Sequence, residues 1–275
     1  MGRPFYLAIE GVIGVGKTTL ARLLQPRFDA ELLLEVFEEN PFLSDFYADR
    51  ERYAFQTQIF FLLSRYRQQQ RVQLNNRPLI ADYTFAKDRL FAHLNLQGDE
   101  LEMYERVHRA LAEKIILPDL IVYLRASPET LMARIAMRDR PYERGMDPAY
   151  IESVRQAYED HFAQYDEVPV LAIETDELDF VRHPQDLDYV EGLIRTALSA
   201  AEVRARIEAV SEPSAEARQR WQVIEEFLTL TKAVGALGAA LSSGSENMSD
   251  SAVPALNASA ESLRRLRVLL ERAKE

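Results

Sequence analysis

A short segment near the amino terminus combines glycines with a lysine and a threonine at a spacing that suits phosphate binding. The residues 11–18, GVIGVGKT, match the pattern GxxxxGK[ST] at each fixed position. Glycines let backbone N–H groups wrap around phosphate oxygens, and the N-terminus of a following helix favours an anion. Lys17 would bridge phosphates and the Thr18 hydroxyl could bind Mg²⁺. The residues predicted to bind the phosphate groups of a ligand are Gly11, Gly14, Gly16, Lys17, Thr18 and Thr19.

A purely structural glycine turn is the alternative for this segment, but Lys17 and Thr18 would have no packing reason to follow it. The motif alone does not identify the acceptor of a phosphoryl group.

Three glutamates follow the second short apolar run of the chain. They are Glu35, Glu38 and Glu39, in the segment LLLEVFEENPF. In an open α/β sheet the carboxyl ends of the strands face the ligand crevice, so a carboxylate there could take the proton of an attacking hydroxyl. Glu35 is the best placed of the three. The alternative is that all three are solvated loop residues.

Three arginines gather in the segment RIAMRDRPYERG. Arg134 and Arg138 are four residues apart and share a helix face, with Arg140 just beyond. Their guanidinium groups could converge on phosphoryl oxygens as a lid closes over the site. The alternative is a structural ion-pair network with Glu129, Asp139 and Glu143.

The elements that would position these residues follow from the alternation of short apolar runs with longer helical patterns. The apolar runs cover residues 5–9, 32–34, 79–81, 120–124 and 170–173. Strands that are apolar on both faces suit a parallel sheet covered by helices on each side. We therefore predict a doubly wound α/β domain over residues 1–200. Between the second and third runs, a long buried helix is predicted to contain Tyr53, Phe55, Ile59, Phe60, Leu62, Leu63 and Tyr66.

The carboxyl-terminal part of the chain has a different pattern, and we predict a helical extension over residues 201–275. Apolar residues recur on one helical face at Val223, Phe227, Leu230, Val234, Leu237 and Leu241, and again at Leu256, Ala260, Leu263, Leu266 and Leu270. A polar break at residues 242–251 separates the two, so a helical hairpin is predicted. It could serve packing or oligomerisation, or, alternatively, contact a lipid surface.

Composition limits the classes of function. The 275 residues carry a net charge of −11, which argues against a surface that coats nucleic acid. With 47% hydrophobic residues, the chain can bury a full core. It contains no run of about 18 apolar residues and no secretory signal pattern, so we expect a soluble cytoplasmic protein that binds no membrane.

Taken together, the phosphate loop, the glutamate after the second strand and the segments FQTQIFFLLSR, ADYTFAKDR and RIAMRDRPYERG resemble the deoxynucleoside kinase family. The resemblance covers residues 5–195. It implies a P-loop kinase fold with a parallel five-stranded sheet, a homodimer, and Mg²⁺-dependent transfer of the γ-phosphoryl group of ATP to the 5′-hydroxyl of a deoxynucleoside.

The resemblance also implies roles for individual residues. Glu35 would be the general base, while Lys17 and the arginines Arg134, Arg138 and Arg140 would stabilise charge. The residues that would read the base are Gln58, Arg65 and Asp88. Tyr47 and Glu143 would hold the sugar 3′-hydroxyl, and Asp82 would lie close to Mg²⁺ with Thr18. An Arg65–Asp88 pair suits a base with an exocyclic amino group, so purine deoxynucleosides or deoxycytidine are expected rather than thymidine. An ordinary ion pair between helix and loop is the alternative for Arg65 and Asp88.

One departure from the family pattern concerns the residue after Asp82. The family has an arginine there and this chain has Tyr83, which cannot supply a permanent positive charge. Either a lid arginine substitutes, or turnover is weak, or the acceptor differs. Two other functions therefore stay open: a nucleoside monophosphate kinase of the thymidylate type, and a non-catalytic nucleotide-binding module.

Overall fold

The computed structural model describes residues 4–70, 77–208, 222–223, 225–227, 229–235, 237 and 248–272. Two compact units divide the chain, Met1–Val168 and Pro169–Glu275. All residues predicted to act in the site belong to the first unit. The predicted division at residue 200 differs from this one and remains a prediction about domains.

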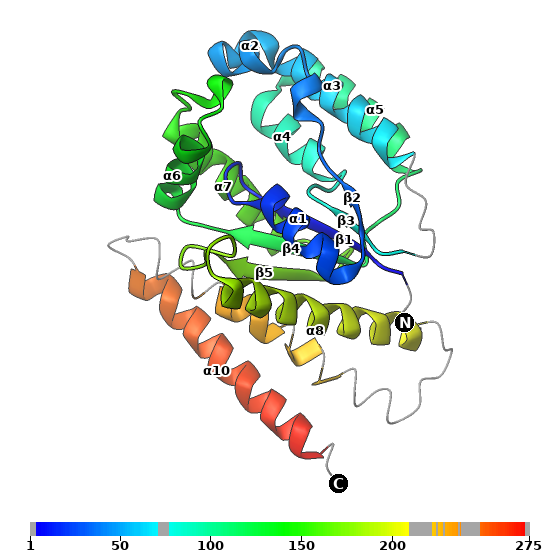
Figure 1. Cartoon of the computed structure of the whole chain (residues 1–275), viewed down its shortest axis with the longest axis vertical. Helices are drawn as coiled ribbons and strands as arrows, with labels where there is room; N and C mark the ends of the chain where they lie inside the picture. The colour runs from blue at the N-terminus through cyan, green and yellow to red at the C-terminus, as the bar shows by residue number, and fades with distance from the viewer. Residues whose placement is uncertain are drawn as a thin grey trace. The chain divides into compact units, whose positions relative to one another are not determined.

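A five-stranded sheet lies in the chain, with strand order β2-β3-β1-β4-β5 (Figure 1). The strands are β1 (Tyr6–Gly11), β2 (Glu31–Leu33), β3 (Leu79–Ala81), β4 (Leu120–Arg125) and β5 (Val170–Glu174). Each lies on one of the predicted apolar runs. Strand β1 pairs in parallel with β3 and with β4, so that Leu7 is opposite both Ile80 and Leu120. The prediction of a parallel five-stranded sheet is confirmed.

Burial explains why these runs form strands. All residues of β1, β3 and β4 are buried, whereas the edge strand β2 is partly exposed. A strand covered on both faces needs apolar side chains at successive positions, which is the pattern that the sequence shows. Strand β1 lies between β3 and β4, so the loop that follows Gly11 begins at the carboxyl end of the central strand of the sheet.

Helices of the first unit connect these strands. They are α1 (Lys17–Phe28), α2 (Leu43–Ala48), α3 (Arg50–Gln69), α4 (Lys87–Asn95), α5 (Gly98–Ala112), α6 (Pro128–Arg138) and α7 (Pro148–Ala163), with short 3₁₀ turns η1 (Phe37–Glu39) and η2 (Pro141–Glu143). Several begin with a side-chain cap: the Asp49 carboxylate accepts from the amide of Arg52, and the Ser127 hydroxyl from that of Thr130. Helix α3 packs against α2, α4 and α5.

Helix α3 confirms the predicted long helix, but its buried face differs from the expected one. Leu63 is 46% exposed, while the polar residues Gln58, Arg65 and Gln69 are buried. The sequence predicts a heavily buried helix in which Leu63 is covered. Instead, the buried face of α3 contains polar residues, some of which line a cavity described below, and Leu63 lies on the exposed face.

The second unit contains β5, α8 (Pro184–Glu208) and α10 (Met248–Arg272). Described residues between 222 and 237 are also helical, and Leu241 lies outside the described residues. The predicted polar break is too long, because Met248–Ser251 belong to α10. Leu256 and Leu263, expected on the packing face of this helix, are 53% and 54% exposed, whereas Ser259 and Ser262 are buried.

Arg265 of α10 forms an ion pair with Glu226, at 3.3 Å between guanidinium and carboxylate. This contact links the two helical segments that were predicted to form a hairpin, and the hairpin itself remains a prediction. Among the residues that the structure describes, no helix combines the length and the apolar composition that a membrane span requires.

Candidate active site

The loop between β1 and α1 depends on glycine at two positions. Gly11 has φ 141°, and a Cβ built there would lie 2.4 Å from the carbonyl oxygen of Leu124. Gly14 has φ 90°, and its Cβ would lie 2.7 Å from a side-chain carbon of Ile135. Both the positive φ angles and the close approach of β4 and α6 exclude larger residues. The loop can therefore turn tightly and direct its amide groups to one place.

Lys17, the first residue of α1, folds back onto this loop. Its ammonium group donates to the carbonyl oxygens of Gly11, at 2.7 Å, and Val12, at 3.0 Å. Burial and the like charge of Lys87 lower the pKa of Lys17 to about 8. A buried ammonium held by two neutral carbonyls is well suited to receive a phosphate, because the added negative charge would compensate its desolvation.

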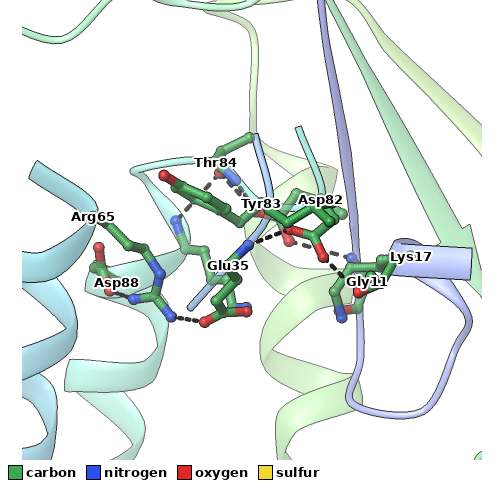
Figure 2. Close-up of polar contacts among 12 residues, drawn as sticks. Gly11, Lys17, Glu35, Arg65, Asp82, Tyr83, Thr84 and Asp88 are labelled. Atoms are coloured by element: carbon green, nitrogen blue, oxygen red, sulfur yellow. Dashed lines mark hydrogen bonds and ion pairs between the residues drawn. The ribbon is translucent and has the colours of Figure 1, made fainter. Parts of the chain in front are cut away.

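Asp82 follows β3 directly and joins the phosphate loop to the segment after β2. Its carboxylate accepts from the Thr18 hydroxyl at 2.5 Å and from the amide of Glu35 at 2.7 Å (Figure 2). A hydroxyl and a carboxylate side by side are oxygen ligands of the kind that Mg²⁺ prefers, with phosphate oxygens and water completing the shell. Thr18 and Asp82 thus fit the predicted metal site.

Glu35 lies two residues beyond β2, between Asp82 on one side and the Arg65–Asp88 pair on the other (Figure 2). Arg65 binds one oxygen of the Glu35 carboxylate, and the Lys87 ammonium lies 2.7 Å from the other. Arg65 also forms an ion pair with Asp88. Burial alone would raise the pKa of Glu35, but the charges of Arg65 and Lys87 outweigh it and hold that pKa far below its ordinary value. Glu35 is therefore ionised at neutral pH.

A second group of side chains comes from α2 and from the segment after α6. Arg138 binds Glu143 through two hydrogen bonds of 2.5 and 2.6 Å, and Arg140 lies 3.7 Å from the same carboxylate. Tyr47 stacks on Tyr142 with ring centroids 6.1 Å apart. The ion pairs expected in the structural alternative for the arginines are thus partly present, with Glu143 as the shared acceptor.

One cavity brings most of the predicted site residues together. Those that line it are Gly14, Lys17, Thr18, Glu35, Tyr47, Gln58, Arg65, Asp82, Arg138, Arg140 and Glu143. Asp88 contributes through its ion pair with Arg65. Arg134 does not line the cavity; its guanidinium donates to the carbonyl oxygen of Val15 in the phosphate loop, at 3.2 Å. Gly11 and Gly16 shape the loop, and Thr19 is exposed on α1.

The cavity also contains residues that the sequence reasoning did not assign. Lys87 is the charged one, and the others are mainly aromatic: Phe37, Phe46, Phe61, Phe91, Tyr142 and Tyr150. The sequence feature that could have identified Lys87 is its position in the segment ADYTFAKDR, next to Asp88 and before an apolar helix face. For the aromatic residues, periodicity indicates burial but cannot distinguish a core from the wall of a cavity.

Tyr83 does not line the cavity and packs inside the protein instead. Its side chain is fully buried, and its hydroxyl donates to the side-chain oxygen of Gln68 on α3 at 3.0 Å. The next residue, Thr84, is held by the buried carboxylate of Glu10, which accepts from the Thr84 amide and hydroxyl at 2.5 and 2.8 Å. Tyr158 of α7 donates to the same carboxylate at 2.9 Å.

The site combines a glycine loop, a lysine at the start of the helix that follows it, an adjacent hydroxyl–carboxylate pair and an ionised glutamate that lines the same cavity. This combination defines a P-loop phosphotransferase. The model of the deoxynucleoside kinase family matches residues 7–198 of the chain. The chain therefore belongs to the deoxynucleoside kinase family, as its motifs predicted.

Similar proteins agree with this assignment. A deoxyguanosine kinase of Bacillus subtilis is 34% identical over 198 residues, which are 69% of this chain and 96% of that protein. A deoxyadenosine kinase of Dictyostelium discoideum is 34% identical over 174 residues, or 61% of this chain and 71% of the relative. The structure of a deoxyadenosine kinase from M. mycoides with bound dCTP matches 70% of this chain and 99% of its own, with a TM-score of 0.60 and 26% identity.

Family membership confirms two predictions. The protein is an enzyme that transfers a phosphoryl group to a hydroxyl group of a deoxynucleoside, and a nucleotide is its phosphoryl donor. The non-catalytic module, one of the two alternatives, is not supported.

Proposed function

We propose that the enzyme transfers the γ-phosphoryl group of ATP to the 5′-hydroxyl of a purine deoxynucleoside. The observation that carries the proposal is the position of Glu35: its ionised carboxylate lines the same cavity as Lys17 and Thr18. Glu38 and Glu39, the other two candidates, are exposed and do not line that cavity. A proton acceptor thus faces the phosphate-binding loop.

In the proposed step, the 5′-oxygen attacks the γ-phosphorus while the bond between that phosphorus and the β–γ bridging oxygen breaks. The 5′-hydroxyl proton goes to Glu35, and ADP leaves. Each oxygen of the Glu35 carboxylate has lone pairs beyond the one that a cation occupies, so ion pairing leaves it able to accept the proton. Lys17 and the guanidinium groups of Arg138 and Arg140 would compensate the charge on the phosphoryl oxygens.

Mg²⁺ is proposed to bind at the hydroxyl of Thr18 and the carboxylate of Asp82. When bound, it would neutralise charge on the donor phosphates. Arg134 is proposed to act through the phosphate loop, since its guanidinium holds the carbonyl of Val15.

The base preference rests on Arg65, Asp88 and Gln58. Arg65 and Asp88 are almost fully buried and paired, and Gln58 lies on the same helix as Arg65, seven residues earlier. A site with fixed donors and acceptors rejects a base that leaves them unpaired. The relatives named above are kinases of deoxyguanosine and deoxyadenosine, which favours a purine. Tyr47 and Glu143, which line the same cavity, are proposed to bind the sugar 3′-hydroxyl.

The homodimer, the cytoplasmic location and the absence of nucleic-acid binding remain proposals. The resemblance supports the dimer, and the net charge of −11 supports a protein that does not coat nucleic acid.

The first experiment measures transfer of labelled phosphate from ATP to each of the four deoxynucleosides and to their monophosphates, with the product identified by mass spectrometry. We expect a purine deoxynucleoside 5′-monophosphate as the main product. The monophosphates are included because a kinase of the thymidylate type needs a cation near the acceptor, and Lys87 is such a cation. Phosphorylation of monophosphates alone would overturn the proposal.

The second experiment tests the proton acceptor with Glu35→Gln, using Glu38→Gln as the matched control. Loss of general-base catalysis should lower kcat by about 10²–10⁴-fold, while Glu38→Gln, three residues away and exposed, should leave it unchanged. Near-normal turnover of Glu35→Gln would contradict proton abstraction by this carboxylate.

A further inference from the structure

Tyr83, the residue after Asp82, brings no positive charge to the cavity. The Tyr83 hydroxyl is bound to Gln68, the side chain is fully buried, and it does not line the cavity. Burial raises the pKa of Tyr83 far above its ordinary value, so the group is neutral at any physiological pH.

Lys87 is a second buried cation beside Glu35, in addition to Arg65. It is the first residue of α4, it is 8% exposed, and its ammonium lies 2.7 Å from an oxygen of Glu35. The ring of Phe91, one helical turn further on, lies 5.7 Å from the ammonium, close enough for a cation–π contact. Because a lysine is costly to bury without a partner, these contacts keep Lys87 in this position.

Two cations bind the Glu35 carboxylate, and they differ in their other ion pairs. Arg65 binds one carboxylate oxygen and Asp88 as well, whereas Lys87, within the part of the chain that the structure describes, forms an ion pair with Glu35 alone. Lys87 also lines the cavity beside Lys17. An ammonium has three N–H donors, so the bond to Glu35 leaves Lys87 with donors for a ligand in the cavity.

We infer that Lys87 is a positioning residue for Glu35: it holds one carboxylate oxygen while Arg65 holds the other, and so orients the carboxylate toward the acceptor hydroxyl. This inference rests on the proposed function. It extends that function by assigning a role to a buried cation of the cavity.

The balance between kcat and KM offers a readout that a merely structural lysine would not move. The charged groups nearest Glu35 are Arg65 from α3 and Lys87 from α4, which bind its carboxylate, and Asp82 after β3, which accepts from its amide. A residue that positions the carboxylate for proton transfer acts on the chemical step, so its loss should lower kcat more than it raises the KM for either substrate.

The experiment compares Lys87→Met with Lys87→Arg and with the control Lys114→Met, a lysine that is exposed after α5. For Lys87→Met we expect kcat to fall by about 10²-fold, as for loss of one charged donor, with a much smaller change in the KM for ATP. Lys87→Arg, which keeps the charge, should recover most of kcat, and Lys114→Met should behave as the wild type.

If Lys87→Met does not fold by circular dichroism, Lys87→Gln, which keeps a polar group, is measured instead.

Unchanged kcat in the folded Lys87 variant would overturn the inference, and so would a Lys87→Arg enzyme as weak as Lys87→Met. A wild-type enzyme that phosphorylates no deoxynucleoside would instead overturn the proposed function. The two failures are therefore distinguishable.

Discussion

The two sides of the cavity are built in different ways. The phosphate loop, which forms the centre of the phosphate side, is one continuous segment, residues 11–18, and its backbone carbonyls bind Lys17. The acceptor side comes from side chains that are distant in the sequence: Glu35, Arg65, Lys87 and Asp88 form a chain of buried ion pairs. One side is thus specified locally, and the other depends on the packing of α3 and α4 against the sheet.

This difference predicts different tolerance to change. Backbone groups of a tight loop remain in place when a neighbouring side chain is replaced. In a buried ion-pair network, removal of one partner leaves a charge uncompensated, which typically costs about 3–5 kcal/mol. Substitutions on the phosphate side should therefore affect ATP alone, while those on the acceptor side should change acceptor binding, base preference and stability together.

Lys17→Met should give the largest effect and break the phosphate side only. We expect transfer to fall by about 10³-fold, because a buried cation aimed at the phosphates is lost. Binding of the deoxynucleoside, measured by calorimetry without ATP, should stay within about twofold. An equal loss of deoxynucleoside affinity would show that the two sides are not separate.

Asp88→Asn should break the acceptor side with a smaller effect. The amide keeps the shape but removes the charge that pairs with Arg65, so Arg65 would bind Glu35 more tightly. For the preferred deoxynucleoside we expect kcat/KM to fall by about 10–100-fold, the equivalent of one hydrogen bond to a charged group. The ratio of rates between the bases should change, and ADP affinity should not. Asp99→Asn, at an exposed position of α5, is the control; an unchanged base ratio in Asp88→Asn would contradict a role in base reading.

Tyr83→Phe should give the smallest effect and sharpen the comparison. It removes the hydrogen bond to Gln68 without changing the cavity lining, so the loss should be about 1 kcal/mol of stability. For a domain of this size the melting temperature should fall by about 2–4 °C. The kcat should hardly change. A large loss of kcat with normal stability would indicate that Tyr83 takes part in the reaction after all.

The same contrast explains how much the sequence could predict. The phosphate loop and the five strands could be predicted because their signals are local: a fixed motif and apolar runs. Asp82 was assigned through the resemblance. The resemblance identified Gln58, Arg65 and Asp88, and their convergence could not have been derived from spacing, since it depends on how α3 and α4 cross.

Lys87 and the exposure of Leu63 show where local patterns are insufficient. Periodicity indicates that one face of a helix is buried, but it does not say whether that face meets a core or a polar cavity. In α3 the cavity is on the inner face, so Arg65 is buried and Leu63 is outside. On α10 the predicted apolar stripe is also exposed at Leu256 and Leu263, because Ser259 and Ser262 take the inner positions.

The buried carboxylate of Glu10 has a consequence for engineering by recombination. Its partners, Thr84 and Tyr158, come from the β3–α4 connection and from α7. A chimera that takes α7 from a donor sequence with phenylalanine at position 158 would remove one donor from an anion beneath the phosphate loop. Crossover points should therefore keep residues 10, 84 and 158 from the same parent, even though 148 positions separate the first from the last.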